Sequence, residues 1–135
     1  MSKLEDNIAY ENKDPKYGYN TSQFAYDRAE REGLIVITPT PNQLFIDLDS
    51  AESGRIFTDQ LGVLYDLVTG VRMTPSMSGL PHQHAVVTLN RDVTEPERIA
   101  MQASLGSDRR CEILRFMRYL NNDPQPTLFL ERKPS

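Results

Sequence analysis

Tryptophan and paired cysteines are absent from this 135-residue sequence. It contains no Trp and a single cysteine, Cys111, so no disulfide can form within the chain and a reducing compartment is expected. No apolar run approaches the roughly 20 residues that a membrane span needs, and the first residues show no apolar signal segment. These absences predict a cytoplasmic protein without a membrane partner.

A large excess of charge of either sign is also missing. The 15 basic and 19 acidic residues give a formal net charge of −4 and a pI near 5.1. This balance excludes a protein that coats nucleic acid by bulk positive charge. The 39% hydrophobic and 25% charged content is typical of a globular protein, and the length fits one domain.

The first 33 residues differ in composition from the rest. Residues 1–20 are polar, contain Tyr10, Tyr17 and Tyr19, and show no sustained period, so they are predicted to be irregular. Residues 21–32 predict a short helix that ends at Gly33. We expect an N-terminal arm over residues 1–33, packed on its own core or on a partner, and an α+β domain over residues 34–135.

Apolar alternation and capping signals predict the elements of that domain. Strands are expected over residues 34–37, 44–49, 71–74, 82–89 and 127–131. Ser50 is predicted to cap a helix that continues to about Val68. The capping box Thr94–Glu97 is predicted to open a second helix, which is interrupted at residues 106–108 and resumes to Leu120. From Leu44 onward the order is β-α-β-β-α-β, that of a ferredoxin-like or RRM-like sandwich.

Alternation along the strands divides their side chains between two faces of the predicted sheet. When the apolar alternates face the helices, the open face receives three carboxylates and both histidines. Its predicted members are Phe45, Asp47, Asp49, His82, His84, Val86, Thr88, Thr127, Phe129 and Glu131. Because Mg²⁺ and Mn²⁺ prefer oxygen ligands, Asp47, Asp49 and Glu131 are candidate metal ligands. The alternatives are that Asp49 caps the next helix and that the other acids are solvated.

Two further groups of residues fit phosphate binding. The small-residue loop Ser76-Met-Ser-Gly79 offers hydroxyl and amide donors through Ser76, Ser78 and Gly79. The late helix carries four arginines, which are Arg109, Arg110, Arg115 and Arg118. Arginine at this density suits phosphate or an acidic partner, and the alternative is a solvated helix face.

Three motifs together resemble the archaeo-eukaryotic primase superfamily. They are the segment Phe45-Ile-Asp-Leu-Asp49, the loop of residues 76–79 that leads to His84, and a late strand that ends in Glu131. The resemblance covers about residues 42–131. It implies an RRM-like fold and a small, phage-type, metal-dependent nucleotidyltransferase or nucleotide-binding domain.

The resemblance also implies roles for particular residues. Asp47 and Asp49 would bind the catalytic Mg²⁺ or Mn²⁺, and Glu131 would replace the family's last acid. His84 would contact the phosphates of the incoming nucleotide, together with the loop of residues 76–79 and with Arg109 and Arg110.

A second resemblance points to a different reaction. Pro81-His-Gln-His-Ala-Val-Val87 resembles the histidine strand of the HUH endonucleases, which nick single-stranded DNA. It implies that His82, His84 and an acid bind one metal and that Tyr119 attacks the DNA.

Two interpretations without catalysis stay open. A short acidic chain with an aromatic arm fits a phage accessory or inhibitor protein that binds a host protein. The predicted exposure of Phe45 and Phe129 also allows single-stranded nucleic acid to bind by stacking.

Overall fold

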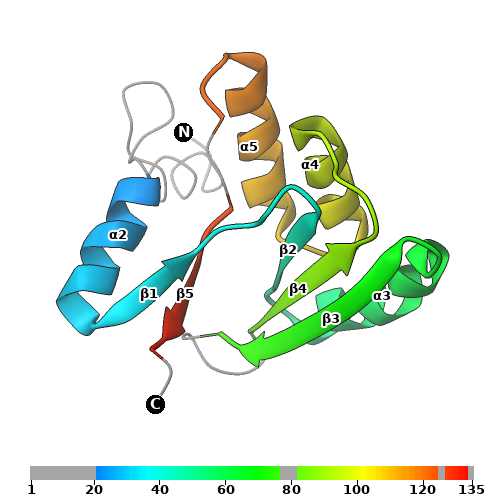
Figure 1. The fold of residues 1–135 in the computed structure, drawn as a ribbon, viewed down its shortest axis with the longest axis horizontal. Coiled ribbons are helices and arrows are strands. Elements are labelled where there is room, and N and C mark those ends of the chain that lie inside the picture. The colour runs from blue at the N-terminus through cyan, green and yellow to red at the C-terminus, as the bar shows by residue number, and fades with distance from the viewer. Residues whose placement is uncertain (1–20, 77–81, 125–126, 134–135) are drawn as a thin grey trace. The chain divides into compact units, whose positions relative to one another are not determined.

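Short segments rich in Leu, Ile and Val form the strands of two antiparallel sheets in the computed structural model, which describes residues 21–76, 82–124 and 127–133 (Figure 1). The chain divides into two compact units, one of residues Pro39–Thr127 and one that joins Met1–Thr38 to Leu128–Ser135. The predicted α+β class is confirmed. None of the described helices is both long and apolar enough to cross a membrane.

The discontinuous unit contains one helix and a two-stranded sheet. Helix α2 (Thr21–Glu32) is followed by strand β1 (Leu34–Ile37), which pairs antiparallel with β5 (Phe129–Arg132). The predicted helix and its end are confirmed, because Gly33 adopts a φ of +67°, which residues with a Cβ rarely adopt. The predicted arm over residues 1–33 and domain over 34–135 stay predictions, since residues 1–20 lie outside the described part of the chain.

The continuous unit contains a three-stranded antiparallel sheet in the order β2-β4-β3. Its elements follow the predicted order: β2 (Gln43–Leu48), α3 (Ala51–Leu61), the 3-10 helix η1 (Gly62–Leu64), β3 (Val68–Pro75), β4 (Gln83–Leu89), α4 (Glu95–Ser104) and α5 (Arg109–Leu120). Helix α3 is shorter than expected, since it ends at Leu61 rather than near Val68.

Both predicted helix caps are present. Ser50 Oγ accepts a hydrogen bond from the backbone N–H of Ser53, and the backbone N–H of Ser50 donates one to Ser53 Oγ. Thr94 and Glu97 form the same reciprocal box at the start of α4. Such caps satisfy backbone donors that the first turn of a helix cannot pair internally.

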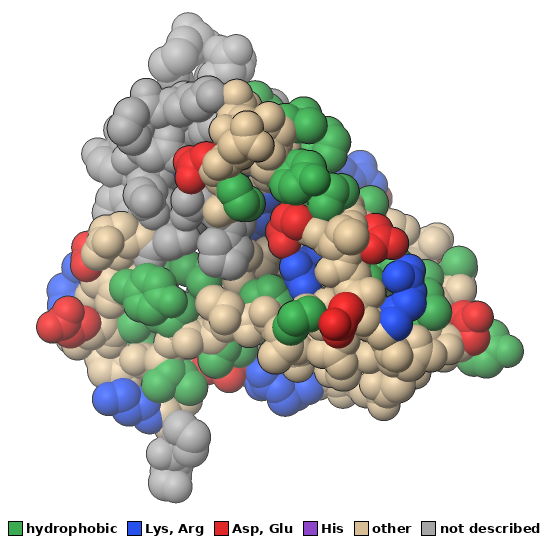
Figure 2. All heavy atoms as spheres, turned by 45° about the horizontal axis from the view of Figure 1, so that its top comes forward, with side chains coloured by type: hydrophobic (Ala, Val, Ile, Leu, Met, Phe, Trp, Pro, Cys, Tyr) green, Lys and Arg blue, Asp and Glu red, His purple; other side chains and the backbone are tan. Residues whose placement is uncertain are grey.

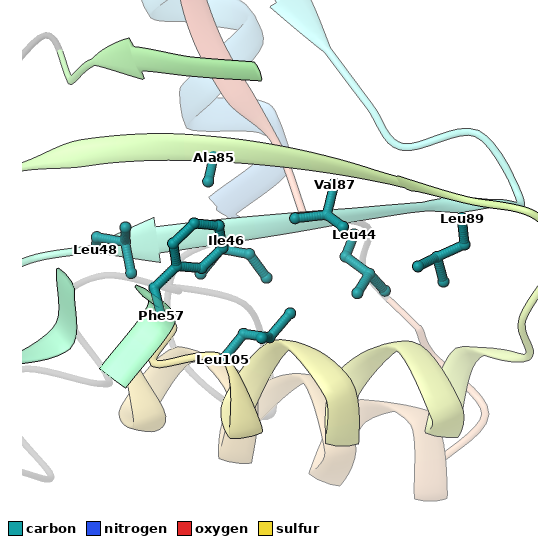
Figure 3. Packing of buried hydrophobic residues seen from close by; sticks show 8 residues of the cluster. All are labelled: Leu44, Ile46, Leu48, Phe57, Ala85, Val87, Leu89 and Leu105. Carbon is teal, nitrogen blue, oxygen red and sulfur yellow. The ribbon is translucent and has the colours of Figure 1, made fainter. Parts of the chain in front are cut away.

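The core lies between this sheet and helices α3 and α4. Apolar residues alternate along β2 and β4, so every second side chain points to the same face (Figure 3). That face packs against Phe57 of α3 and Leu105 at the end of α4. The fully enclosed cluster consists of Leu44, Ile46, Leu48, Phe57, Ala85, Val87, Leu89 and Leu105. The predicted assignment of these β2 and β4 residues to the helix side is therefore confirmed.

The free edge of β2 is closed by polar side chains from α4 and the turn after it. The backbone N–H of Phe45 donates to Gln102 Oε1 at 2.8 Å, and that of Asp47 donates to Ser107 Oγ at 3.0 Å. Arg98 Nε donates to the carbonyl oxygen of Gln43 at 3.0 Å. Because β5 pairs with β1, a single four-stranded ferredoxin-like sheet is not confirmed.

Candidate functional site

Asp47 and His84 face each other between the edge strand β2 and its neighbour β4, near the end of β2. They are register partners on β2 and β4, and His84 Nε2 lies 3.8 Å from Asp47 Oδ1. Both side chains project from the face opposite the apolar core, as the alternation of β2 requires. The Asp47 side chain is 37% exposed and that of His84 is 13% exposed, so a ligand can reach the carboxylate while the imidazole stays largely enclosed.

Acidic neighbours and burial alter the protonation of Asp47. Burial raises the pKa of Asp47 from 3.8 to about 6, and the negative charges of Asp108 and Asp49 act in the same direction. Arg115 and His82 oppose this rise in pKa but do not cancel it. The carboxylate therefore lies in surroundings that disfavour its own negative charge, and groups with a perturbed pKa occur preferentially at functional sites.

A buried polar network lies next to this site and holds its backbone. Glu112 is 1% exposed and accepts hydrogen bonds from Gln102 Nε2 at 3.0 Å and from Arg115 Nη1 at 2.6 Å. Ser107 Oγ, which accepts the N–H of Asp47, donates to Glu112 at 3.4 Å. Burial raises the pKa of Glu112 above its ordinary value. Asp47 is thus held by a chain of bonds that ends on a buried carboxylate of α5.

The sequence placed Arg115 on the late helix but predicted no role for Gln102, Ser107 or Glu112. Gln102 and Ser107 bond backbone groups of β2 that lie 57 and 60 positions away. A sequence contains no periodic signal for contacts of this kind. A glutamine at an apolar position of a helix is the one local indication, because buried polar groups require partners.

The other predicted metal ligands are placed differently. Asp49 follows the end of β2 and is exposed, and its charge reaches Asp47. Glu131 lies on β5 in the discontinuous unit, where its register partner is Ile35. The structure thus brings Asp47 near Asp49 and His84, and the roles of all of these residues in metal binding stay predictions.

The predicted phosphate-binding residues are distributed over the continuous unit. Ser76 follows β3, and its backbone N–H donates to the carbonyl oxygen of His82 at 3.1 Å. Ser78 and Gly79 lie outside the described residues. Arg110 Nη2 lies 3.6 Å from Asp108 Oδ2, close to the Asp47 site. Arg109 is exposed at the start of α5, where it lines a groove with apolar residues of α4.

The two phenylalanines that were expected to stack on bases are buried. Phe45 is 2% exposed and Phe129 is 3% exposed, so the expectation that their rings are open to bases is wrong. The face opposite the core is thus closed at Phe45 and at its cross-strand neighbour Val86, which is 7% exposed. Tyr119, the candidate nucleophile of the nickase interpretation, lies on α5 and is 38% exposed.

The donor set at Asp47 fits a hard divalent cation that shares its coordination with a ligand. Within the described segments, no three His, Cys, Asp or Glu side chains are grouped closely enough to hold an ion. Mg²⁺, however, is bound in many proteins by one or two carboxylates, with water and substrate phosphates completing its shell. Asp47 and Asp49 can supply such carboxylates, and His84 Nε2 can contact the same ion or its phosphate.

No protein-family model, curated protein or solved structure matches this chain.

Proposed function

We propose that the unit Pro39–Thr127 binds a nucleoside triphosphate together with Mg²⁺ or Mn²⁺ at Asp47. The observation that carries this proposal is the Asp47–His84 pair, 3.8 Å apart at a site where Asp49 and Asp108 add negative charge. A cation relieves the repulsion among these carboxylates and turns a surface that repels phosphate into one that attracts it. His84 beside Asp47 and Arg110 beside Asp108 would supply the groups that contact the phosphate oxygens.

The class of reaction that we propose is nucleotidyl transfer in a small, cytoplasmic, phage-type protein related to the primases. The antiparallel order β2-β4-β3, with α3 and α4 on one face, supports an RRM-like, ferredoxin-like relationship for this unit. When bound, the metal would neutralise charge on the triphosphate. The chain's own residues would hold the ion at Asp47 and Asp49 and position phosphate at His84.

Calorimetric titration of the full chain with ATP and Mn²⁺ tests the binding proposal. We expect Asp47→Asn and His84→Ala each to weaken binding at least ~10-fold, because each removes one of the two facing groups. Asp92→Asn is the matched control, since Asp92 is exposed and follows the Leu89 end of β4, whereas His84 lies at the other end of that strand. Equal affinity in the parent and in Asp47→Asn would contradict the proposal.

The pH dependence provides a second readout of the same site. Asp47 must lose its proton to bind a cation, and its pKa is about 6. The apparent affinity for Mn²⁺–ATP should therefore be nearly constant above pH 7 and fall about tenfold for each pH unit well below 6. This fall should disappear in Asp47→Asn. Extension of a primed DNA template by the parent chain, and its loss in Asp47→Asn, would distinguish an enzyme from a binding protein.

A further inference from the structure

Helix α5 has its polar and apolar sides reversed relative to an ordinary surface helix. Its buried residues include two charged side chains, Glu112 at 1% and Arg118 at 1% exposure. Its exposed side carries a stripe of large apolar side chains, hereafter the α5 stripe. The stripe consists of Ile113 at 59%, Phe116 at 43%, Met117 at 44% and Leu120 at 62% exposure. A soluble helix normally buries its apolar stripe, so this surface requires a partner.

An apolar groove runs beside the stripe. It has a volume of about 470 Å³, and small residues of α4, among them Ala100 and Ala103, form one of its walls. Ile113, Phe116 and Met117 form the wall on α5. Hydrophobic side chains gather on the surface in this part of the molecule (Figure 2). Small residues on one wall and large ones on the other are suited to receive a second helix.

The spacing of the stripe is compatible with a second copy of α5 as the partner. Positions 113, 116, 117 and 120 are separated by three, one and three residues, so the stripe reads the same in both directions along α5. Two copies of α5 related by a two-fold axis would therefore place Phe116 against Met117 and Ile113 against Leu120 of the other copy. This self-complementary pattern is what an isologous interface requires.

The charges at the two ends of the stripe agree with an antiparallel pair. Arg109 is exposed in the first turn of α5, where its positive charge opposes the helix dipole, and among the described residues it forms no ion pair. At the other end, Asp123 lies just beyond the last turn, where one of its carboxylate oxygens is 3.6 Å from Arg118 Nη1 and its side chain is still 57% exposed. Antiparallel packing places Arg109 of each copy near Asp123 and the final carbonyl groups of the other, where a positive charge is stabilised.

We infer that the α5 stripe and its groove form the interface of a homodimer in which the α5 helices of two copies pack antiparallel. About half of each of the four stripe side chains is exposed, which amounts to roughly 400 Å² of apolar surface per copy. A standard interface buries about 800 Å² per partner, and the α4 wall of the groove supplies part of the remainder. A dimer held by this area should dissociate measurably in the micromolar range.

Sedimentation velocity of the full chain over about 1–300 µM tests the dimer. We expect the mean mass to rise toward twice the chain mass of 15.4 kDa. Phe116→Glu should raise the dissociation constant at least ~10-fold, because it places a charge at the centre of the apolar contact. Val63→Glu on η1 is the matched control, since Val63 is 69% exposed outside the stripe and its substitution should leave the dissociation constant unchanged.

Cysteine crosslinking tests the antiparallel direction. In a Cys111→Ser background, the double variant Ile113→Cys with Leu120→Cys should form a disulfide-linked dimer on mild oxidation, whereas either single variant should not. A crosslink in Ile113→Cys alone would show a parallel pair and overturn the inference. A monomer at every concentration would also overturn it and would leave the stripe to a different protein. Equal effects of Phe116→Glu and Val63→Glu on the dissociation constant would overturn it as well. Circular dichroism confirms folding, and Met117→Glu replaces Phe116→Glu if the latter does not fold.

Discussion

Replacing Gln102 with leucine should destabilise the fold through two buried groups at once. The Gln102 side chain is fully buried, accepts the backbone N–H of Phe45 at 2.8 Å, and donates to the Glu112 carboxylate at 3.0 Å. Leucine has a similar volume but can neither accept nor donate a hydrogen bond. The N–H of Phe45 then has no acceptor from α4, and Glu112 loses one of its buried donors.

The magnitude follows from these two losses. A buried donor left unsatisfied costs about 1–3 kcal/mol, and a lost hydrogen bond to a charged group costs about 1.5–3 kcal/mol. Added apolar burial by leucine offsets about 1 kcal/mol of this. We therefore expect Gln102→Leu to lower the free energy of unfolding by about 3 kcal/mol. With a urea m-value of about 2 kcal/mol/M, the unfolding midpoint should fall by about 1.5 M.

Urea unfolding followed by far-UV circular dichroism is the appropriate assay, since the chain has no Trp for fluorescence. Gln60→Leu on α3 is the control, because Gln60 is exposed and its midpoint should move by less than about 0.3 M. Gln102→Leu combined with Glu112→Leu should be less destabilised than the sum of the two single variants, by about 1 kcal/mol or more. A midpoint shift below about 0.5 M for Gln102→Leu would refute the role assigned to this network.

Two further predictions concern stability. The folded state raises the pKa of Asp47 from 3.8 to about 6, so the contribution of this group to the free energy of unfolding falls as pH rises from about 4 to about 6. Asp47→Asn should therefore be more stable than the parent at pH 7, by about 1 kcal/mol after allowance for solvent exposure, and no more stable than the parent at pH 4. Thermal melts of both proteins at each pH measure this. The same difference in stability between variant and parent at both pH values would contradict the prediction. Gly106→Ala should cost about 2–4 kcal/mol, because Gly106 has a φ of +92° and an added Cβ would lie 2.7 Å from the carbonyl oxygen of Ser53. Gly33→Ala, at a φ of +67° with no atom within 4 Å of the added Cβ, should lower the free energy of unfolding by only about 1 kcal/mol. Chemical denaturation measures both variants. Similar losses of stability in the two would show that the close approach at Gly106 is unimportant.

Local signals predicted most of the elements because their physical causes are themselves local. The caps at Ser50 and Thr94 and the left-handed glycine at position 33 act within one turn of a helix. The end of α3 at Leu61 was not predicted, because Leu64 and Val68 continue its helical period and also pack against the core although the helix has ended. An apolar period predicts which side chains are buried but not whether the backbone at those positions is helical.

The candidate site was predictable only in part, because some of its contacts join segments that are distant in the sequence. Strand alternation placed Asp47 and His84 on one face, and antiparallel register made them partners. The closing of the β2 edge by Gln102 and Ser107 depends on side-chain to backbone bonds between distant segments. No period or composition encodes such bonds.

The closed edge of β2 has a consequence for association between chains. An uncovered strand edge is a template on which strands of other molecules can add, the first step of many aggregation processes. At β2 the groups that would recruit such a strand are already bonded to Gln102, Ser107 and Arg98. Strand β3 lies at the opposite end of the sheet order and carries Val71 and Met73, which are 42% and 45% exposed. Within this three-stranded sheet, intermolecular β-pairing during partial unfolding should therefore begin at β3, and the bulge between Val68 and Gly70 is a feature that opposes it.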